Sequence, residues 1–275
     1  MTVVVKEVAR YYDPKVMPHL WCAGCGNGVI TLAIMRAFAA LDWDPNDIVL
    51  TSGIGCSSRL PFYVKVNTLH TTHGRALAFA TGIKFAKPDF HVVVVTGDGD
   101  ATAIGGNHFI HACRRNIDIT CILINNQTYG MTSGQVSPTT GYGLFASSAP
   151  YGNIEHSFDL SALAQAAGAS YVARSTVYHV EMLPKLIQQG FEHKGFSFIE
   201  VLSACPTYFG KYNKMSKPVD MFNWYKDIAI NINKLKENEK PPTGMVTIGV
   251  LHEEEKPEYI EEYDKMVQRA KAQIS

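Results

Sequence analysis

Two polar motifs follow apolar, β-branched runs at positions where they could hold a metal ion. Val92–Val95 leads into a Gly-Asp-Gly motif with its carboxylate at Asp98, and Ile119–Ile124 leads into Asn125-Asn126. Asp98 and Asn126 are 28 residues apart, which is about one strand–helix–strand crossover. Neighbouring parallel strands would therefore bring both side chains to one edge of a sheet. A carboxylate, an amide oxygen and a nearby backbone carbonyl suit Mg²⁺, which takes its other ligands from phosphates and water.

Either motif alone is typical of a tight turn. Their combination, at this spacing and after two matching apolar runs, favours a metal site beside a phosphate-bearing ligand. Gly97 and Gly99 would let the backbone approach those phosphates closely. A dinucleotide site is disfavoured because Thr102 stands where its fingerprint needs glycine, and no G-x-x-x-x-G-K-[ST] sequence occurs.

Four of the six cysteines also stand where loops are expected. Cys22 and Cys25 form a C-x-x-C pair ahead of a predicted helix, whereas Cys56 and Cys205 follow predicted strands. Four thiolates can hold an iron–sulfur cluster or a structural zinc ion. A redox pair of Cys22 and Cys25 would leave the other two unexplained, and unconnected thiols are the remaining alternative. Two cysteines are expected to be small buried hydrophobes inside a helix and a strand: Cys113 and Cys121.

The elements that must position these residues alternate along the chain. Short apolar runs that indicate buried parallel strands occur at 47–51, 92–95, 119–124 and 196–202. Helical patterns surround them at 28–41, 75–87, 103–116, 160–167 and 178–192. This alternation predicts an α/β fold, an open and mostly parallel sheet with helices on both faces and right-handed crossovers. Ligands of such sheets bind beyond the carboxyl ends of the strands, where the polar motifs stand.

One long segment lacks charge. Residues 119–154 contain no Asp, Glu, Lys or Arg, and 129–143 is rich in Gly, Ser and Thr. A long irregular segment inside a compact domain is usually either functional or disordered. Disordered segments are poor in aromatic residues, whereas this one carries Tyr129, Tyr142 and Phe145. An ordered loop over a ligand is therefore expected.

Composition limits the kinds of partner. The 275 residues are 46% hydrophobic, which is enough for a sizeable core. Basic and acidic residues cancel at 25 each, so neither nucleic acid nor an anionic membrane surface is an expected partner. Charged residues make up only 18%, against roughly 25% in average domains, which suggests a surface partly covered by other subunits.

Targeting signals are not apparent. The uncharged stretch 16–35 contains Pro18 and three glycines, so it is not expected to span a membrane. No signal peptide is visible at the N-terminus. A cytoplasmic location is expected, where the cysteines would stay reduced.

The charge distribution changes near residue 210. Charged residues are sparse before it and frequent after it. Residues 1–210 are therefore expected to form the α/β domain and 211–275 a C-terminal extension that packs on a partner subunit. Within the extension we expect an apolar anchor at 221–225, a short apolar run at 245–251 and a charged helix at about 257–272.

Six stretches resemble, in order, the β subunit of 2-oxoacid:ferredoxin oxidoreductases, a thiamine diphosphate-binding family. They are WCAGCGNG, SGIGCSSR, HTTHGRALAFATGIK, VVVVTGDGDATAIGGNH, INNQTYGMTSGQVSPTT and LSACPTY, and they span about residues 21–208. The G-D-G and Asn-Asn motifs resemble the thiamine diphosphate signature. The resemblance implies oxidative decarboxylation of a 2-oxoacid with coenzyme A, with electrons passing through one [4Fe–4S] cluster to ferredoxin.

The resemblance also assigns residues. Asp98, Asn126 and the Thr128 carbonyl would bind Mg²⁺. The cluster ligands would be Cys22, Cys25, Cys56 and Cys205. The expected thiamine diphosphate contacts are Gly55, Cys56, Ser57, Ser58, His73, Gly74, Arg75, Asp98, Gly99, Asp100, Asn126, Thr128, Tyr129, Gly130, Met131 and Thr132.

Two further side chains are candidates for the reaction itself. The planar guanidinium of Arg59 could bind the substrate carboxylate. Binding of a phosphate, or a salt bridge to another subunit, is an equally suitable role for it. His73 could hydrogen-bond the diphosphate or the reacting centre, and a structural role is the alternative.

Partners and substrate follow from the same resemblance. The family implies an α subunit, which supplies the glutamate that activates thiamine, in an α2β2 assembly. The separate short β chain and its Cys205-Pro-Thr-Tyr ending are most similar to 2-oxoglutarate members, with pyruvate and broad-specificity members as the alternative. Two other classes remain: a thiamine-dependent decarboxylase or ligase without redox chemistry, which has no need of four thiolates, and a zinc-stapled, non-catalytic assembly subunit.

Overall fold

The computed structural model describes residues 6–236 and 239–274. Within them, eight strands form one sheet in the order β2-β1-β3-β4-β6-β5-β8-β7. The strands are β1 (Ile48–Ser52), β2 (Asn67–His70), β3 (His91–Gly97), β4 (Thr120–Asn125), β5 (Tyr171–Thr176), β6 (Ser197–Leu202), β7 (Ala229–Asn231) and β8 (Val246–Glu253). β1 to β6 are all parallel, whereas β8 is antiparallel to β5 and pairs in parallel with β7. The predicted open, mostly parallel α/β sheet is confirmed.

Helices and single turns connect the strands. The α-helices of the described residues are α1 (Asn27–Ala40), α2 (Ala76–Ala86), α3 (Gly106–Arg115), α4 (Leu160–Ala166), α5 (Leu183–Glu192), α6 (Pro218–Ile228) and α7 (Tyr259–Ile274). Shorter 3₁₀ segments are η1 (Lys6–Tyr11), η2 (Pro14–Val16), η3 (Ser57–Tyr63) and η6 (Ile232–Lys234), and π turns are η4 (Asp100–Ile104) and η5 (Pro206–Gly210). Across residues 6–236 and 239–274, none of the helices has both the length and the hydrophobicity that crossing a bilayer requires.

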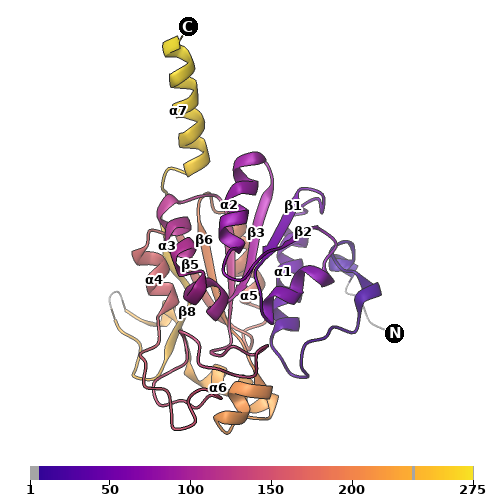
Figure 1. Cartoon of the computed structure of the whole chain (residues 1–275), viewed down its shortest axis with the longest axis vertical. Helices are drawn as coiled ribbons and strands as arrows, with labels where there is room; N and C mark the ends of the chain where they lie inside the picture. The colour runs from indigo at the N-terminus through magenta and orange to yellow at the C-terminus, as the bar shows by residue number, and fades with distance from the viewer. Residues whose placement is uncertain (1–5, 237–238, 275) are drawn as a thin grey trace.

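The sheet is buried on both faces, which explains its uninterrupted apolar runs. Side chains alternate along β3: Val93 and Val95 join the core under α1 and α5, while Val92 and Val94 join the core under α2, α3 and α4. The ribbon shows these helix layers on either side of the central strands (Figure 1). The strand ends are therefore the places where polar side chains can gather.

Strand order places the site. β1 pairs with β2 on one side and with β3 on the other, so the chain reverses its direction across the sheet at β1. A reversal of this kind opens a crevice at the carboxyl ends of the strands. β3 and β4 are parallel neighbours with Gly97 opposite Ile124, so Asp98 and Asn126 leave the sheet at the same edge. The predicted juxtaposition of the two motifs is confirmed.

The C-terminal residues take part in the same fold. β8 extends the main sheet through β5, and Met221 and Tyr225 of α6 are fully buried in the core under α1 and α5. The predicted anchor at 221–225 is therefore confirmed, and most of the apolar run at 245–251 lies in β8. α7 begins against the body, where Tyr259 and Tyr263 contact the Phe85 ring, and then projects away from it (Figure 1).

Some elements escaped the sequence analysis for physical reasons. β2 (Asn67–His70) is a largely exposed edge strand with a polar sequence, and β5 carries Arg174 in its centre. α3 begins at Gly106, later than expected, because η4 precedes it. α5 likewise begins only at Leu183, with Pro184 in its first turn.

Candidate active site

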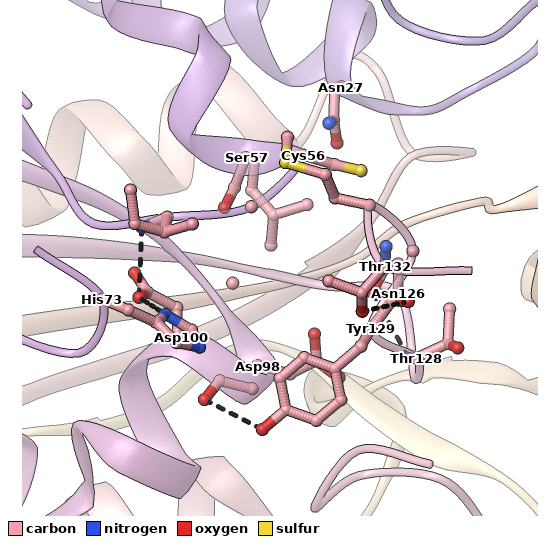
Figure 2. Close-up of a pocket in the computed structure, with 17 residues that line it drawn as sticks. Asn27, Cys56, Ser57, His73, Asp98, Asp100, Asn126, Thr128, Tyr129 and Thr132 are labelled. Carbon is pink, nitrogen blue, oxygen red and sulfur yellow. Dashed lines mark hydrogen bonds and ion pairs between the residues drawn. The ribbon is translucent and has the colours of Figure 1, made fainter. Parts of the chain in front are cut away.

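A pocket opens at the carboxyl ends of β1, β3 and β4. Its walls are residues 54–57 after β1, 97–100 at the end of β3, and 124, 126 and 128–132 at and after the end of β4, together with Asn27 and His73 (Figure 2). It encloses about 620 Å³, including open solvent at its mouth.

Three polar groups converge at the base of this pocket. One terminal atom of the Asn126 amide lies 3.1 Å from Asp98 Oδ1 and 2.7 Å from the Thr128 carbonyl oxygen, and with the amide turned so that this atom is the nitrogen it donates to both. Such separations are close to the roughly 3.0 Å between adjacent ligands of an octahedral Mg²⁺ with about 2.1 Å bonds. Three acceptors facing one another need a cation between them, or a rotated amide whose nitrogen donates to the other two. The donor set therefore fits a hard divalent ion.

The uncharged loop closes over Asp98 from the other side. The Ser137 and Thr139 hydroxyls donate to Asp98 Oδ2 at 2.5 and 2.7 Å. Burial raises the pKa of Asp98 to about 6, even though these two hydroxyls lower it. Oδ2 is thus held by the protein and Oδ1 is left facing Asn126. The expectation of an ordered loop at this position is confirmed.

Asp100, the next carboxylate, is engaged by protein donors. Its Oδ1 accepts from His73 Nδ1 at 2.5 Å, Gly74 N at 2.7 Å and Ile54 N at 3.2 Å, and Oδ2 accepts from Thr96 Oγ1 at 2.8 Å. Asp100 is 3% exposed. It therefore joins three segments of the pocket wall and orients the half-buried His73 ring (Figure 2).

The four predicted cysteines gather beside the pocket. A methyl group at Gly130 would lie 3.4 Å from Cys56 Sγ and 3.7 Å from Cys205 Sγ. Burial, and to a smaller extent the neighbouring thiols, raise the pKa of the Cys25 thiol to about 12 and that of Cys56 to about 11. Within the described residues, no group of three or more Cys, His, Asp or Glu side chains is close enough together to hold a metal ion. The four are neighbours, and the raised pKa values keep the Cys25 and Cys56 thiols protonated at neutral pH.

Backbone donors point at these sulfurs. The Asn27 backbone N–H donates to Cys25, and the Tyr208 and Phe209 backbone N–H groups donate to Cys205. In each case the hydrogen bond lowers a thiol pKa that burial has raised. N–H···S bonds of this kind accompany iron–sulfur clusters and tune their potentials. The two remaining cysteines lie fully buried in the core under α2, α3 and α4, as expected: Cys113 and Cys121.

Comparison with known proteins agrees with this geometry. The family described as thiamine pyrophosphate enzyme, C-terminal TPP binding domain, matches residues 53–201. The 2-oxoglutarate synthase subunit KorB of Methanocaldococcus jannaschii is 52% identical over 265 residues, covering 96% of this chain and 98% of that protein. This chain belongs to the 2-oxoacid:ferredoxin oxidoreductase β subunits.

Two further relatives place this β subunit within the family. The 2-oxoacid:ferredoxin oxidoreductase subunit beta of Saccharolobus solfataricus is 46% identical over 196 residues, covering 70% of this chain and 64% of that protein. A solved structure, 2-oxoglutarate:ferredoxin oxidoreductase from Magnetococcus marinus with 2-oxoglutarate, coenzyme A and succinyl-CoA bound, matches with a TM-score of 0.86 at 34% identity. That match covers 94% of this chain and 89% of the other.

Most of the predicted site residues of the β subunit line the pocket. The lining includes Gly55, Cys56, Ser57, His73, Asp98, Gly99, Asp100, Asn126, Thr128, Tyr129, Gly130, Met131 and Thr132. Of the predicted thiamine contacts and reaction residues, four are outside the wall: Ser58, Arg59, Gly74 and Arg75. Three of the predicted cluster ligands are outside it as well: Cys22, Cys25 and Cys205. Arg75 donates instead to the Gly74 and Ile104 carbonyls. The positive charge of Arg59 lowers the thiol pKa of the neighbouring Cys56.

One polar lining residue was missed by the sequence analysis. Asn27, at the start of α1, is 2% exposed, and its side-chain Nδ2 has no hydrogen-bond partner. It stands near Cys56 in Figure 2. Its position directly after the C-x-x-C segment and before a helix was the available signal. A buried amide donor facing the pocket is available to a ligand.

Proposed function

We propose that this chain is the catalytic β subunit of a 2-oxoglutarate:ferredoxin oxidoreductase. The complex converts 2-oxoglutarate and coenzyme A to succinyl-CoA and CO2 and passes the electrons to ferredoxin. The observation that carries the proposal is the joint presence, at one pocket, of an oxygen triad for a metal–diphosphate and four neighbouring thiols. Similarity along nearly the whole chain to 2-oxoglutarate synthase subunits supports 2-oxoglutarate over pyruvate.

The oxygen triad is proposed to hold thiamine diphosphate through Mg²⁺. Asp98 Oδ1, the Asn126 amide oxygen and the Thr128 carbonyl supply three hard ligands, and the diphosphate and water complete the shell. Tyr129 lies so close above Gly99 that a methyl group there would be 2.3 Å from its ring. The glycine thus gives Tyr129 room at the pocket wall.

The four thiols are proposed to hold one [4Fe–4S] cluster. Their pKa values, raised by burial, mean that cluster assembly releases protons from Cys25 and Cys56. Gly130 lies beside two of them, so that a methyl group there would be in van der Waals contact with the Cys56 and Cys205 sulfurs. A reduced thiol set of this kind belongs in the cytoplasm, where we place the complex.

The chemistry follows from these two groups. Bound thiamine diphosphate supplies the carbon nucleophile and electron sink for 2-oxoacid decarboxylation, and a neighbouring iron–sulfur cluster accepts single electrons. The chain's own side chains position these groups. Asp98 and Asn126 would fix the diphosphate end of the cofactor. His73, held by Asp100, presents a ring N–H or nitrogen to the pocket. Arg59 is proposed to attract the substrate carboxylate from beside Cys56.

A partner subunit is proposed to cover the outer end of α7 and to complete an α2β2 assembly. Tyr263 and Met266 are 42% and 50% exposed on this projecting helix. Ending the chain after Asp264 keeps the buried Ile260 and the Phe85 contact of Tyr263, yet removes most of the exposed helix. Copurification of the partner with the shortened chain at full yield would refute this docking role.

The test of the function is an anaerobic visible spectrum of the complex copurified with its natural partner. We expect brown iron–sulfur absorbance that bleaches after 2-oxoglutarate and coenzyme A are added. Bleaching by pyruvate alone would retain the family and change the substrate. Colourless protein containing zinc but no iron or thiamine would overturn the proposal in favour of a structural subunit.

A pair of cysteine variants sharpens this test. Cys205→Ser should remove the cluster and electron transfer, whereas Cys113→Ser, in the opposite core, should retain both. Electron transfer that survives in a cluster-free Cys205→Ser complex would contradict the oxidoreductase mechanism.

A further inference from the structure

A buried ion pair crosses two central strands of the sheet. Arg174 of β5 and Glu200 of β6 are register partners, and Arg174 Nε donates to Glu200 Oε2 at 2.8 Å. Their exposed fractions are only 6% and 3%. Well-packed hydrophobic residues in place of such a pair are often equally or more stable. A gain in stability therefore does not explain its presence.

The pair is one end of a hydrogen-bonded chain that reaches the metal edge. Glu200 Oε1 accepts from Asn125 Nδ2 at 2.8 Å. The Asn125 oxygen accepts from Gln127 N at 3.1 Å and lies 2.9 Å from Thr139 Oγ1. Thr139 Oγ1 also lies 2.7 Å from Asp98 Oδ2, so its single hydroxyl proton is shared between the Asp98 carboxylate and the Asn125 oxygen. Every member from Glu200 to Asp98 is buried, except Gln127, which is half-buried.

Register explains how a residue of β6 reaches this far. Leu123 of β4 is the register partner of Glu200, and Asn125 lies two residues further along β4 on the same face. An ionised carboxylate only accepts hydrogen bonds, so Glu200 selects the NH2 end of the Asn125 amide. The amide oxygen must then face Gln127 and Thr139. Arg174 and the Ser161 hydroxyl occupy the other Glu200 oxygen and hold the carboxylate in place.

The orientation of Asn125 matters because it shapes the turn that carries two metal ligands. Gln127, between Asn126 and Thr128, has a left-handed φ of 57°, which is uncommon for a residue with a side chain. The Asn125 oxygen supports that conformation by accepting the Gln127 N–H. A misoriented amide would disturb the Asn126 side chain and the Thr128 carbonyl together.

We propose that the buried Arg174–Glu200 pair is a positioning device for the magnesium edge, acting through Asn125 on the 125–128 turn and, through Thr139, on Asp98. The inference rests on the proposed function, since it assigns these residues to the metal–diphosphate site. Arg174 and Glu200 touch neither metal nor substrate. Their effect is to set the angle at which three oxygen ligands meet.

The experiment measures the apparent Kd for Mg²⁺ in thiamine diphosphate binding, by calorimetry on the copurified complex. Glu200→Gln keeps the shape of the side chain but also offers an NH2 group, so it no longer fixes the Asn125 amide. We expect Mg²⁺ to bind about 10–100-fold more weakly, with thiamine diphosphate binding restored at high Mg²⁺. The double variant Arg174→Met/Glu200→Gln, which leaves no unpaired buried charge, should show the same loss.

Lys84→Met is the matched control. Lys84 is also buried and ion-paired, 2.7 Å from Asp118, but Asp118 precedes β4 at the opposite end of the strand. Its removal should weaken folding and leave the Mg²⁺ affinity unchanged. A Glu200→Gln complex within twofold of wild type, or an equal loss in Lys84→Met, would overturn the inference. Wild type without Mg²⁺-dependent thiamine binding would instead overturn the proposed function.

Discussion

Replacement of Asp100 by asparagine is the most informative single perturbation of the pocket wall. The buried carboxylate accepts four hydrogen bonds, from His73, Gly74, Ile54 and Thr96. Asn is nearly the same shape, and its oxygen can keep the three contacts now made by Oδ1. Its NH2 group would face the Thr96 hydroxyl, which can rotate to accept. Asp100→Asn therefore removes the charge from the network without leaving an unpaired donor.

The expected loss of stability follows from the change in these hydrogen bonds. A hydrogen bond to a charged group contributes about 1 kcal/mol more than a neutral one, which gives about 4 kcal/mol for the four bonds. The lower cost of burying a neutral amide offsets part of this, leaving an expected loss of about 2 kcal/mol in the free energy of unfolding. For 275 residues, that corresponds to a fall of roughly 3 °C in Tm.

Thermal and urea unfolding of the complex provide the assay, with thiamine diphosphate affinity as a second measurement. The affinity should fall as well, because Asp100 joins the segments at Ile54 and Gly74 to the loop after β3. Asp89→Asn, at an exposed turn, is the matched control and should change stability by less than about 0.5 kcal/mol. An Asp100→Asn protein with unchanged Tm and thiamine affinity would show that the carboxylate does not hold the pocket wall together.

Three further predictions concern stability, cofactor and substrate. Lys84→Met should cost about 3 kcal/mol at pH 7, because it leaves the Asp118 carboxylate without its closest cation. Burial raises the pKa of Asp118, but attraction to Lys84 outweighs burial and the net pKa is lowered. The difference in free energy of unfolding between wild type and Lys84→Met, measured with urea, should therefore be full above about pH 4 and become smaller as the pH falls below that. Gly99→Ala should weaken thiamine diphosphate binding about tenfold or more in calorimetry, since the new methyl group displaces the Tyr129 ring by roughly 1 Å, with little change in the urea midpoint. Arg59→Ala should raise the KM for 2-oxoglutarate with thiamine content unchanged, and loss of bound thiamine would contradict the substrate role.

The sequence by itself determined the sheet and the ends of its central strands. Uninterrupted apolar runs such as Val92–Val95 have few alternatives to a doubly buried parallel strand, and polar residues that directly follow them must lie at the sheet edge. The spacing of Asp98 and Asn126 therefore sufficed to predict that they meet, because neighbouring parallel strands allow one register between them. The four cysteines were equally predictable as a group from their positions in the chain.

Tertiary structure decided which side chains each of these residues contacts. The Ser137 and Thr139 hydroxyls and the Arg174–Glu200 pair have no local pattern that marks them. Their roles arise from contacts between residues far apart in the chain. The role of a buried polar group depends on the partner with which it forms a hydrogen bond. Asp100 shows this most directly: the family resemblance implied a cofactor contact for it, and only the folded chain shows that its carboxylate also joins the loops that form the wall.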